Sequence, residues 1–262
     1  MTENFFYVVL PSNVKNGYTN KANNFRIRLP NQIDLSGGNW EVGLSELIYP
    51  LSHYNIGNGA NMDRCIVFQV LDSVVYVLIE KGFYKTIDIF VQKLNEQCKN
   101  ALPEGSGAKF SFDRTSYKTR LTLPQAIDLK FMGRELSYCL GFPFRTASIQ
   151  FDESRTAVST YAADISAALQ EMYIYSDIVA PQIVGQGQAN LLKLISLASI
   201  KGERQFGDKV HVKFTKPQFL KLRTHIFQEI LTEIKTGSGT EFPFKFGTVI
   251  LTLCFRRASL RL

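Results

Sequence analysis

The stretch that decides the fold is residues 39–50, NWEVGLSELIYP, which holds the only tryptophan of the chain. Trp40, Val42 and Leu44 alternate with polar or small residues. A two-residue period is typical of a strand that buries one face. The stretch therefore predicts a core strand that begins with a buried Trp40 and ends at Pro50.

Glu46 conflicts with this strand, because a regular alternation places its carboxylate on the same apolar face as Leu44. A β-bulge near Ser45 resolves the conflict. One extra residue in a strand reverses the facing of every residue that follows. Without a bulge, Glu46 would be a charge on the core face.

Most of the remaining chain also has the period of strands. The predicted strands cover residues 5–10, 25–29, 66–71, 74–79, 109–113, 117–123, 171–178, 191–200, 209–214, 226–234 and 248–255. Residues 226–234 fit a helix as well as a strand. Gly237-Ser238-Gly239 follows them and favours a strand in a long hairpin with residues 248–255. Turns also predict the hairpins 66–79, through Asp72-Ser73, and 109–123.

Two helices interrupt the strands. Ile87, Phe90, Val91, Leu94 and Cys98 recur at helical spacing. Thr86 precedes them as an N-cap, and Asp88 suits the first turn. A shorter helix is predicted over residues 134–140, with Gly141 as a left-handed C-cap and Phe142 packing back. Residues 146–168 lack a clear period and predict a long loop. Many strands with few helices indicate an all-β sandwich.

The composition is that of a folded protein. Of 262 residues, 45% are hydrophobic, and the formal net charge is +7. Such a charge permits contact with nucleic acid, although no dense run of Lys and Arg is present. The candidate nucleic-acid-facing residues are Arg26 and Arg28 on one strand and Arg256 and Arg257 on another. The alternative is that these charges guard the edge strands of a sheet.

Four cysteines, Cys65, Cys98, Cys139 and Cys254, lie far apart within apolar patterns. That setting predicts free buried thiols, although an even count also permits two disulfides. Their spacing excludes a Cys-x-x-Cys zinc motif. The N-terminus lacks the basic and apolar regions of a signal peptide. No apolar run reaches the roughly 20 residues of a membrane span. A reducing compartment is expected.

No catalytic, cofactor-binding or metal-binding residues are predicted. The three histidines, His53, His211 and His225, form no ligand or catalytic pattern. Gly185-Gln186-Gly187 is interpreted as a turn, because an apolar strand follows it where a phosphate-binding loop requires a helix. We therefore expect the protein not to be an enzyme.

Several blocks, in their order along the chain, resemble the minor capsid (penton) proteins of Polinton, or Maverick, elements and related adinto-like viruses. The blocks are FYVVLPSN at 6–13, NFRIRLP at 24–30, WEVGL at 40–44, YP at 49–50, LGF at 140–142, YIYSDIV at 173–179, PQIVG at 181–185, NLL at 190–192, PF at 243–244, Gly247 and LCFR at 253–256. Cys254 departs from the family, which more often has His there. The resemblance spans residues 6 to 257.

This resemblance implies a single jelly roll of two antiparallel sheets. With the strand pattern, it predicts a jelly roll built from residues 1–80 and 165–262. Residues 81–164 would form an inserted, mixed region carrying the helices.

The resemblance also implies a structural role at the vertex of an icosahedral virion, assembled inside the host cell. Five copies would form a homopentamer that contacts the major capsid protein, a double jelly roll, and possibly the packaged DNA through Arg26, Arg28, Arg256 and Arg257. The main alternative is a non-enzymatic jelly-roll module for host attachment or carbohydrate binding, since jelly rolls serve both uses. The third hypothesis is an enzyme built on a β-sandwich.

Overall fold

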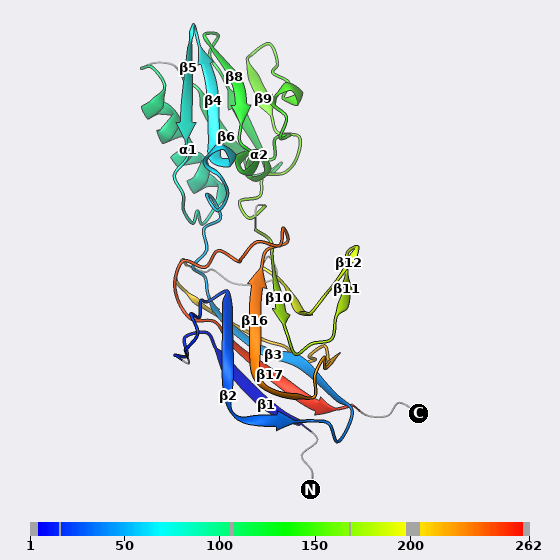
Figure 1. Ribbon diagram of the computed structural model, residues 1–262. Coiled ribbons are helices and arrows are strands. Elements are labelled where there is room, and N and C mark those ends of the chain that lie inside the picture. The colour runs from blue at the N-terminus through cyan, green and yellow to red at the C-terminus, as the bar shows by residue number, and fades with distance from the viewer. Residues whose placement is uncertain (1–4, 16, 105–106, 168, 198–204, 259–262) are drawn as a thin grey trace. The chain divides into compact units, whose positions relative to one another are not determined.

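The structure is a computed structural model that describes residues 5–15, 17–104, 107–167, 169–197 and 205–258. The chain divides into two compact units (Figure 1). The first is formed by both ends of the chain, Met1–His53 and Glu171–Leu262, and the second by Tyr54–Gln170. These bounds differ from the predicted division at 80/81 and 164/165. The strands between 65 and 78 belong to the second unit, because they pair there and not with the strands of the first.

Eight strands of the described first unit form two antiparallel sheets. Their bounds are β1 Phe5–Pro11, β2 Asn24–Asp34, β3 Trp40–Pro50, β10 Glu171–Ser176, β13 Leu191–Ser196, β14 Lys209–Lys213, β16 Ile226–Lys235 and β17 Ile250–Arg257. The first sheet has the order β1-β17-β3-β14 and the second β13-β10-β16-β2. Numbered along the chain from one to eight, the sheets read 1-8-3-6 and 5-4-7-2. This is the strand order of a jelly roll, so the predicted fold is confirmed.

The pairing corrects one expectation. Residues 226–234 are a strand, as predicted, but β16 pairs with β10 and β2 in the second sheet. The last strand, β17, lies between β1 and β3 in the first sheet. The predicted long hairpin between these two strands is therefore wrong, because the chain crosses from one sheet to the other between them.

Three short strands complete the first unit. β15 (Leu220–Lys221) adds to one end of β3. β11 (Gln182–Val184) and β12 (Gly187–Ala189) form a hairpin closed by Gly185-Gln186, which confirms the predicted turn. Of the strand predicted over residues 191–200, β13 covers Leu191–Ser196, and residues 198–200 lie outside the described part of the chain.

The predicted bulge is present in β3. Leu44 is opposite Leu253 of β17, while Glu46 is opposite Thr252, so Ser45 is the extra residue. The Ser45 hydroxyl donates a hydrogen bond of 2.9 Å to the Thr252 carbonyl oxygen. After the bulge Leu47 is buried in place of Glu46, and the conflict in the sequence pattern disappears.

Trp40 differs from the expectation, because it is only half-buried at the start of β3. Its ring packs edge-on against Phe6, with 5.6 Å between the centroids. Phe6 in turn stacks on Phe255, and Phe255 stacks on Phe227 of the other sheet at 5.8 Å. The tryptophan thus covers one end of an aromatic contact that joins the two sheets, and the buried centre of the strand begins at Val42.

The second unit combines two small sheets, β5-β4-β8 and β6-β7-β9, with two helices. The bounds are η1 Asn61–Arg64, β4 Cys65–Val70, β5 Ser73–Leu78, α1 Ile87–Ala101, β6 Lys109–Asp113, β7 Lys118–Thr122, β8 Ile127–Met132, α2 Arg134–Leu140, η2 Thr146–Ser148 and β9 Thr156–Val158. Both predicted hairpins form, although the turn of the first lies one residue earlier than expected. Residues 146–168 are not a simple loop, since β9 pairs with β7.

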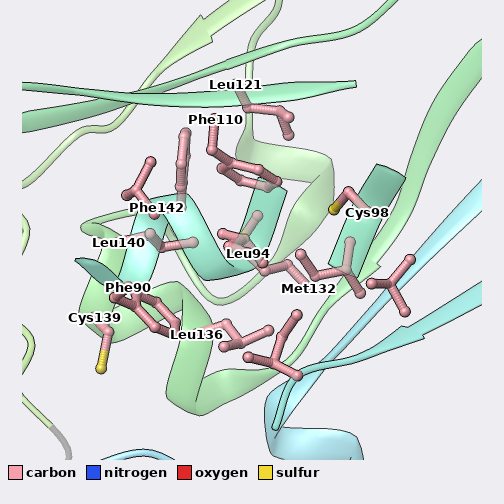
Figure 2. Packing of buried hydrophobic residues seen from close by; sticks show 14 of the residues in the cluster. Phe90, Leu94, Cys98, Phe110, Leu121, Met132, Leu136, Cys139, Leu140 and Phe142 are labelled. Carbon is pink, nitrogen blue, oxygen red and sulfur yellow. The ribbon is translucent and has the colours of Figure 1, made fainter. Parts of the chain in front are cut away.

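Side chains from both helices and both sheets meet in one core (Figure 2). Phe90, Leu94 and Cys98 come from α1, and their spacing of three to four residues places them on one helical face. The Ile89 amide donates to the Thr86 hydroxyl at 3.3 Å, which confirms the predicted N-cap. All four cysteines are free and buried, as predicted.

Helix α2 ends as its sequence predicts. Gly141 has a φ of +75°, in the left-handed region. The Phe142 amide donates to the Ser137 carbonyl oxygen at 2.9 Å, and its ring is buried. A Cβ at Gly141 would lie 2.2 Å from the Tyr161 carbonyl oxygen, so both the backbone angle and the available space require glycine.

We expect the first unit to tolerate deletion of Ser45 but not deletion of Ile48. Deletion of Ser45 restores a regular alternation that keeps Leu47 and Tyr49 in the core and Glu46 in solvent, as in the bulged strand. Deletion of Ile48 reverses the alternation after Leu47 and turns Tyr49 out of the core, at a cost of about 1.5–3 kcal/mol. Fluorescence of the sole tryptophan, Trp40, during denaturation measures the stability of both variants. An equal loss of stability in the two variants would contradict the assignment of Ser45 as the extra residue.

Candidate functional site

Arg26 and Arg28, predicted to face nucleic acid, lie on β2 at an edge of the second sheet. Arg26 is ion-paired with Glu229 at 3.3 Å, and its guanidinium lies 5.7 Å from the centre of the Tyr18 ring. The Tyr18 hydroxyl and then Arg26 hold the pKa of Glu229 below its usual value. Arg28 is exposed on the same strand.

Arg256 and Arg257 lie on β17, in the first sheet. Two nitrogen atoms of Arg256 contact one carboxylate oxygen of Glu41, at 2.9 and 3.1 Å. The Arg256 guanidinium also covers the Phe219 ring at 3.6 Å. Arg257 donates to the Gly37 carbonyl oxygen at 2.9 Å. Both arginines of this pair therefore already donate hydrogen bonds within the protein.

The two predicted basic pairs thus sit on different sheets, and each contains an arginine paired with a glutamate. Glu229 and Glu41 lie more than 200 residues away from their arginines in the chain. No local sequence pattern indicates such a pairing. Arg28 is the member of the set that keeps an exposed guanidinium in an edge strand.

Glu46 points away from the core and joins a small charged group on the first sheet. Its carboxylate lies 3.1 Å from Nε2 of His211 and 3.6 Å from Nζ of Lys213, both on β14. The hydrogen bond with His211 is the main cause that holds the pKa of Glu46 below its usual value. All three side chains are at least one-third exposed, so the group is a solvated ion-pair cluster at a sheet edge.

The other edge of the first sheet is apolar. Among the described strands β1 pairs with β17 alone, and Phe5, Tyr7 and Val9 project from its outer face. Each of these side chains is more than half exposed. We call these three residues the β1 stripe. The strand contains no charged residue between Phe5 and Pro11, whereas proteins that remain monomeric usually protect such an edge with charge.

A similar stripe lies on the second unit. β5 is an edge strand of its sheet, and Val74, Tyr76 and Leu78 are exposed on one of its faces. We call these residues the β5 stripe. Strand β8, at the opposite edge of this sheet, carries Asp128 and Lys130. The first sheet of the jelly roll and the sheet β5-β4-β8 of the second unit therefore each have one apolar and one charged edge.

Sequence reasoning missed both stripes. The β1 and β5 segments are apolar on both faces, a pattern that predicts a strand buried in the middle of a sheet. The signal that distinguishes an edge is the pairing order, which the linear pattern does not contain.

Within the described residues no group of three or more His, Cys, Asp or Glu side chains is placed to hold a metal ion. None of the helices in the described ranges is long and apolar enough to cross a membrane. Two buried titratable groups stand apart from the surfaces above. Burial raises the pKa of Cys98 to about 12 and lowers the pKa of His53 to about 4.

Comparison with known proteins found no matching family model and no match among curated proteins. Solved structures do match. The mavirus penton protein, as its selenomethionine form, aligns with a TM-score of 0.55 at 12% sequence identity, over 97% of this chain and 99% of the other. The chain has the fold of the mavirus penton protein. A chain of the Sputnik virophage structure aligns with a TM-score of 0.56 at 11% identity, over 99% of both chains.

These two alignments extend over the jelly roll and the inserted unit together, since each covers nearly the whole chain. The likeness to the penton fold includes Tyr54–Gln170, which a jelly roll alone would not account for. At such low identity the alignments establish the fold, and they assign no role to single residues.

We expect the stability of the first unit to fall between about pH 6.5 and pH 4 because of His53. Its ring is buried edge-on against Phe242, and Nδ1 has no hydrogen-bond partner. The folded protein therefore binds the proton more weakly than the unfolded chain, and stability present above pH 6.5 is lost as the pH falls. The loss is on the order of 3 kcal/mol when protonation is complete.

Denaturation followed by Trp40 fluorescence at several pH values measures how much stability His53 removes as the pH falls. The proteins compared are the wild type, His53→Leu and the exposed control His225→Leu. The His53 variant should lose less stability than the other two proteins over this range. Parallel pH profiles for all three would contradict the assignment.

Proposed function

We propose that the protein is a structural capsid protein, the penton protein that closes the vertex of an icosahedral virion. The observation that carries the proposal is the shared fold with the mavirus penton protein over both units. A jelly roll alone is compatible with many functions, including attachment and sugar binding. The match of the inserted unit as well as the jelly roll favours the vertex role over a general binding module.

The sequence blocks between residues 6 and 257 support an affiliation with the penton proteins of Polinton, or Maverick, elements. Under this proposal the protein is not an enzyme. It occupies the capsid vertex of the virion, after assembly inside the host cell. Its partners are further copies of itself and a major capsid protein with a double jelly roll.

The apolar edges support assembly into a ring. A closed ring is heterologous, so one side of each subunit meets a different side of its neighbour. The β1 stripe lies opposite the charged edge strand β14 in the same sheet, which gives the jelly roll two unlike sides. Exposed apolar side chains on an unprotected edge strand are costly in a monomer, and a neighbouring copy that covers them removes this cost.

We expect the purified protein to form pentamers, and Tyr7→Lys to weaken them. A lysine in the middle of the β1 stripe would have to be desolvated at the contact between copies. Native mass spectrometry and light scattering over a range of concentrations measure the oligomer. The same change at Tyr76 tests the β5 stripe.

The matched control is Ile89→Lys, which places the same charge at an exposed apolar position on helix α1. It should leave the pentamer intact. A wild-type protein that stays monomeric at high concentration, and also fails to join capsid particles when expressed with a major capsid protein, would contradict the penton role. An unchanged pentamer in Tyr7→Lys would remove the β1 stripe from the contact.

DNA contact by Arg26, Arg28, Arg256 and Arg257 stays a prediction. Arg28 is the best candidate, because Arg26 and Arg256 are paired with glutamates. If Arg28 contacts a phosphate, Arg28→Ala should reduce the slope of log affinity against log salt by about 1, and Arg256→Ala should change it less. Fluorescence anisotropy with duplex DNA at several salt concentrations measures the slopes. Identical slopes in all proteins would exclude these contacts.

A further inference from the structure

A pocket in the second unit lies where helix α2 ends. Its volume is about 530 Å³, within the range of small-ligand sites. It is lined by the last turns of the helix, the following segment around residues 142–148, and Tyr161. Neither the jelly roll nor the two apolar stripes contribute to it.

Besides the buried Phe142, three exposed aromatic residues line the pocket. Tyr138, Phe144 and Tyr161 line the pocket and are 50%, 38% and 65% exposed. Aromatic rings grouped around a hollow and left open to solvent mark a binding surface more often than a scattered exposed residue does. They offer flat apolar faces to a ligand.

The backbone that presents these rings is fixed. The Tyr161 amide donates to the Gly141 carbonyl oxygen at 2.9 Å, and the Tyr161 carbonyl oxygen accepts from the Ser159 hydroxyl at 2.8 Å. The same carbonyl lies so close to Gly141 that no side chain fits there. Tyr161 is therefore held against the end of α2 while most of its side chain remains exposed, which is the preorganisation that a binding site needs.

The polar side chains of the pocket carry either a positive charge or a hydroxyl group. Arg145 lines it and is exposed, and no ion pair of the described residues uses it. The guanidinium of Arg134 lies 5.2 Å from the centre of the Phe144 ring and adds a second positive charge. Among the described residues that line the pocket, none is Asp, Glu, Asn or Gln. The charge of the site thus complements an anion.

We propose that this pocket binds an acidic sugar, a pyranose ring that carries a carboxylate. The C–H face of the ring packs on the aromatic walls, and the carboxylate accepts hydrogen bonds from Arg145, whose fork of N–H donors matches two carboxylate oxygens. A neutral sugar fits less well, because it lacks the carboxylate that would pair with Arg145. A nucleobase fits less well because Asn, Gln, Asp and Glu, which read the edges of adenine and cytosine, are absent from the described lining. The proposed activity adds a sugar-binding site to a structural vertex protein.

To test the site, the 262-residue chain is titrated with sialyllactose and with lactose, and binding is measured by saturation-transfer NMR and calorimetry. The two probes differ in one acidic residue. Sialyllactose should bind with a dissociation constant of about 1 mM, and lactose at least tenfold more weakly. Arg145→Gln and Tyr161→Ala should each weaken sialyllactose at least tenfold. Matched controls are Arg114→Gln and Tyr117→Ala, which alter exposed residues of the same unit outside the pocket and should leave binding unchanged.

Three results would overturn the proposal. They are absence of binding to sialyllactose and to uronic-acid oligosaccharides, equal affinity for lactose, and an affinity that Arg145→Gln does not change. Tighter binding of oligothymidine at the same residues would assign the pocket to nucleic acid instead. The oligomeric state, measured on the same samples, reports separately on the penton role, so failure of one proposal is distinguishable from failure of the other.

Discussion

The jelly roll depends on a bulge that accommodates one extra residue in its most connected strand. β3 pairs with β17, β14 and β15. The side chains that β3 turns toward the core therefore decide which side chains of its neighbours also point there. Val42 and Leu44 are buried before Ser45, and Leu47 and Tyr49 after it. A regular strand would bury either the first pair or the second but not both. The bulge therefore allows both halves of this eleven-residue strand to pack against one core, while Glu46 remains in solvent beside His211.

What the sequence could predict was local. The alternation around Trp40, the conflict at Glu46 and the caps at Thr86 and Gly141 are each contained within a few residues, and each is found in the structure. Their physical causes act over one turn of helix or one step of a strand. The exception is Trp40, which is half-buried, because it lies at the first residue of its strand where the sandwich ends.

What the sequence could not predict was the choice of partners. The period of β16 is the same whether it pairs with β17 or with β2, so the long hairpin was as compatible with the pattern as the true crossing between sheets. The strands between Cys65 and Leu78 look like jelly-roll strands, and only the pairing of β4 with β5 and β8 assigns them to the inserted unit. In the same way, the partner of Arg256 is chosen by the register of β17 against β3, which places Glu41 directly opposite it.

The same limit applies to the surfaces that carry the proposed function, and it has a physical reason. A strand that is apolar on both faces lowers its free energy either in the middle of a sheet or at an edge that another subunit covers. The two cases have the same composition, and they separate only when the pairing order is known. Among the described strands β1 has one partner, β17, and Phe5, Tyr7 and Val9 are more than half exposed. The proposal that a second copy covers them therefore needs the pairing order as well as the sequence.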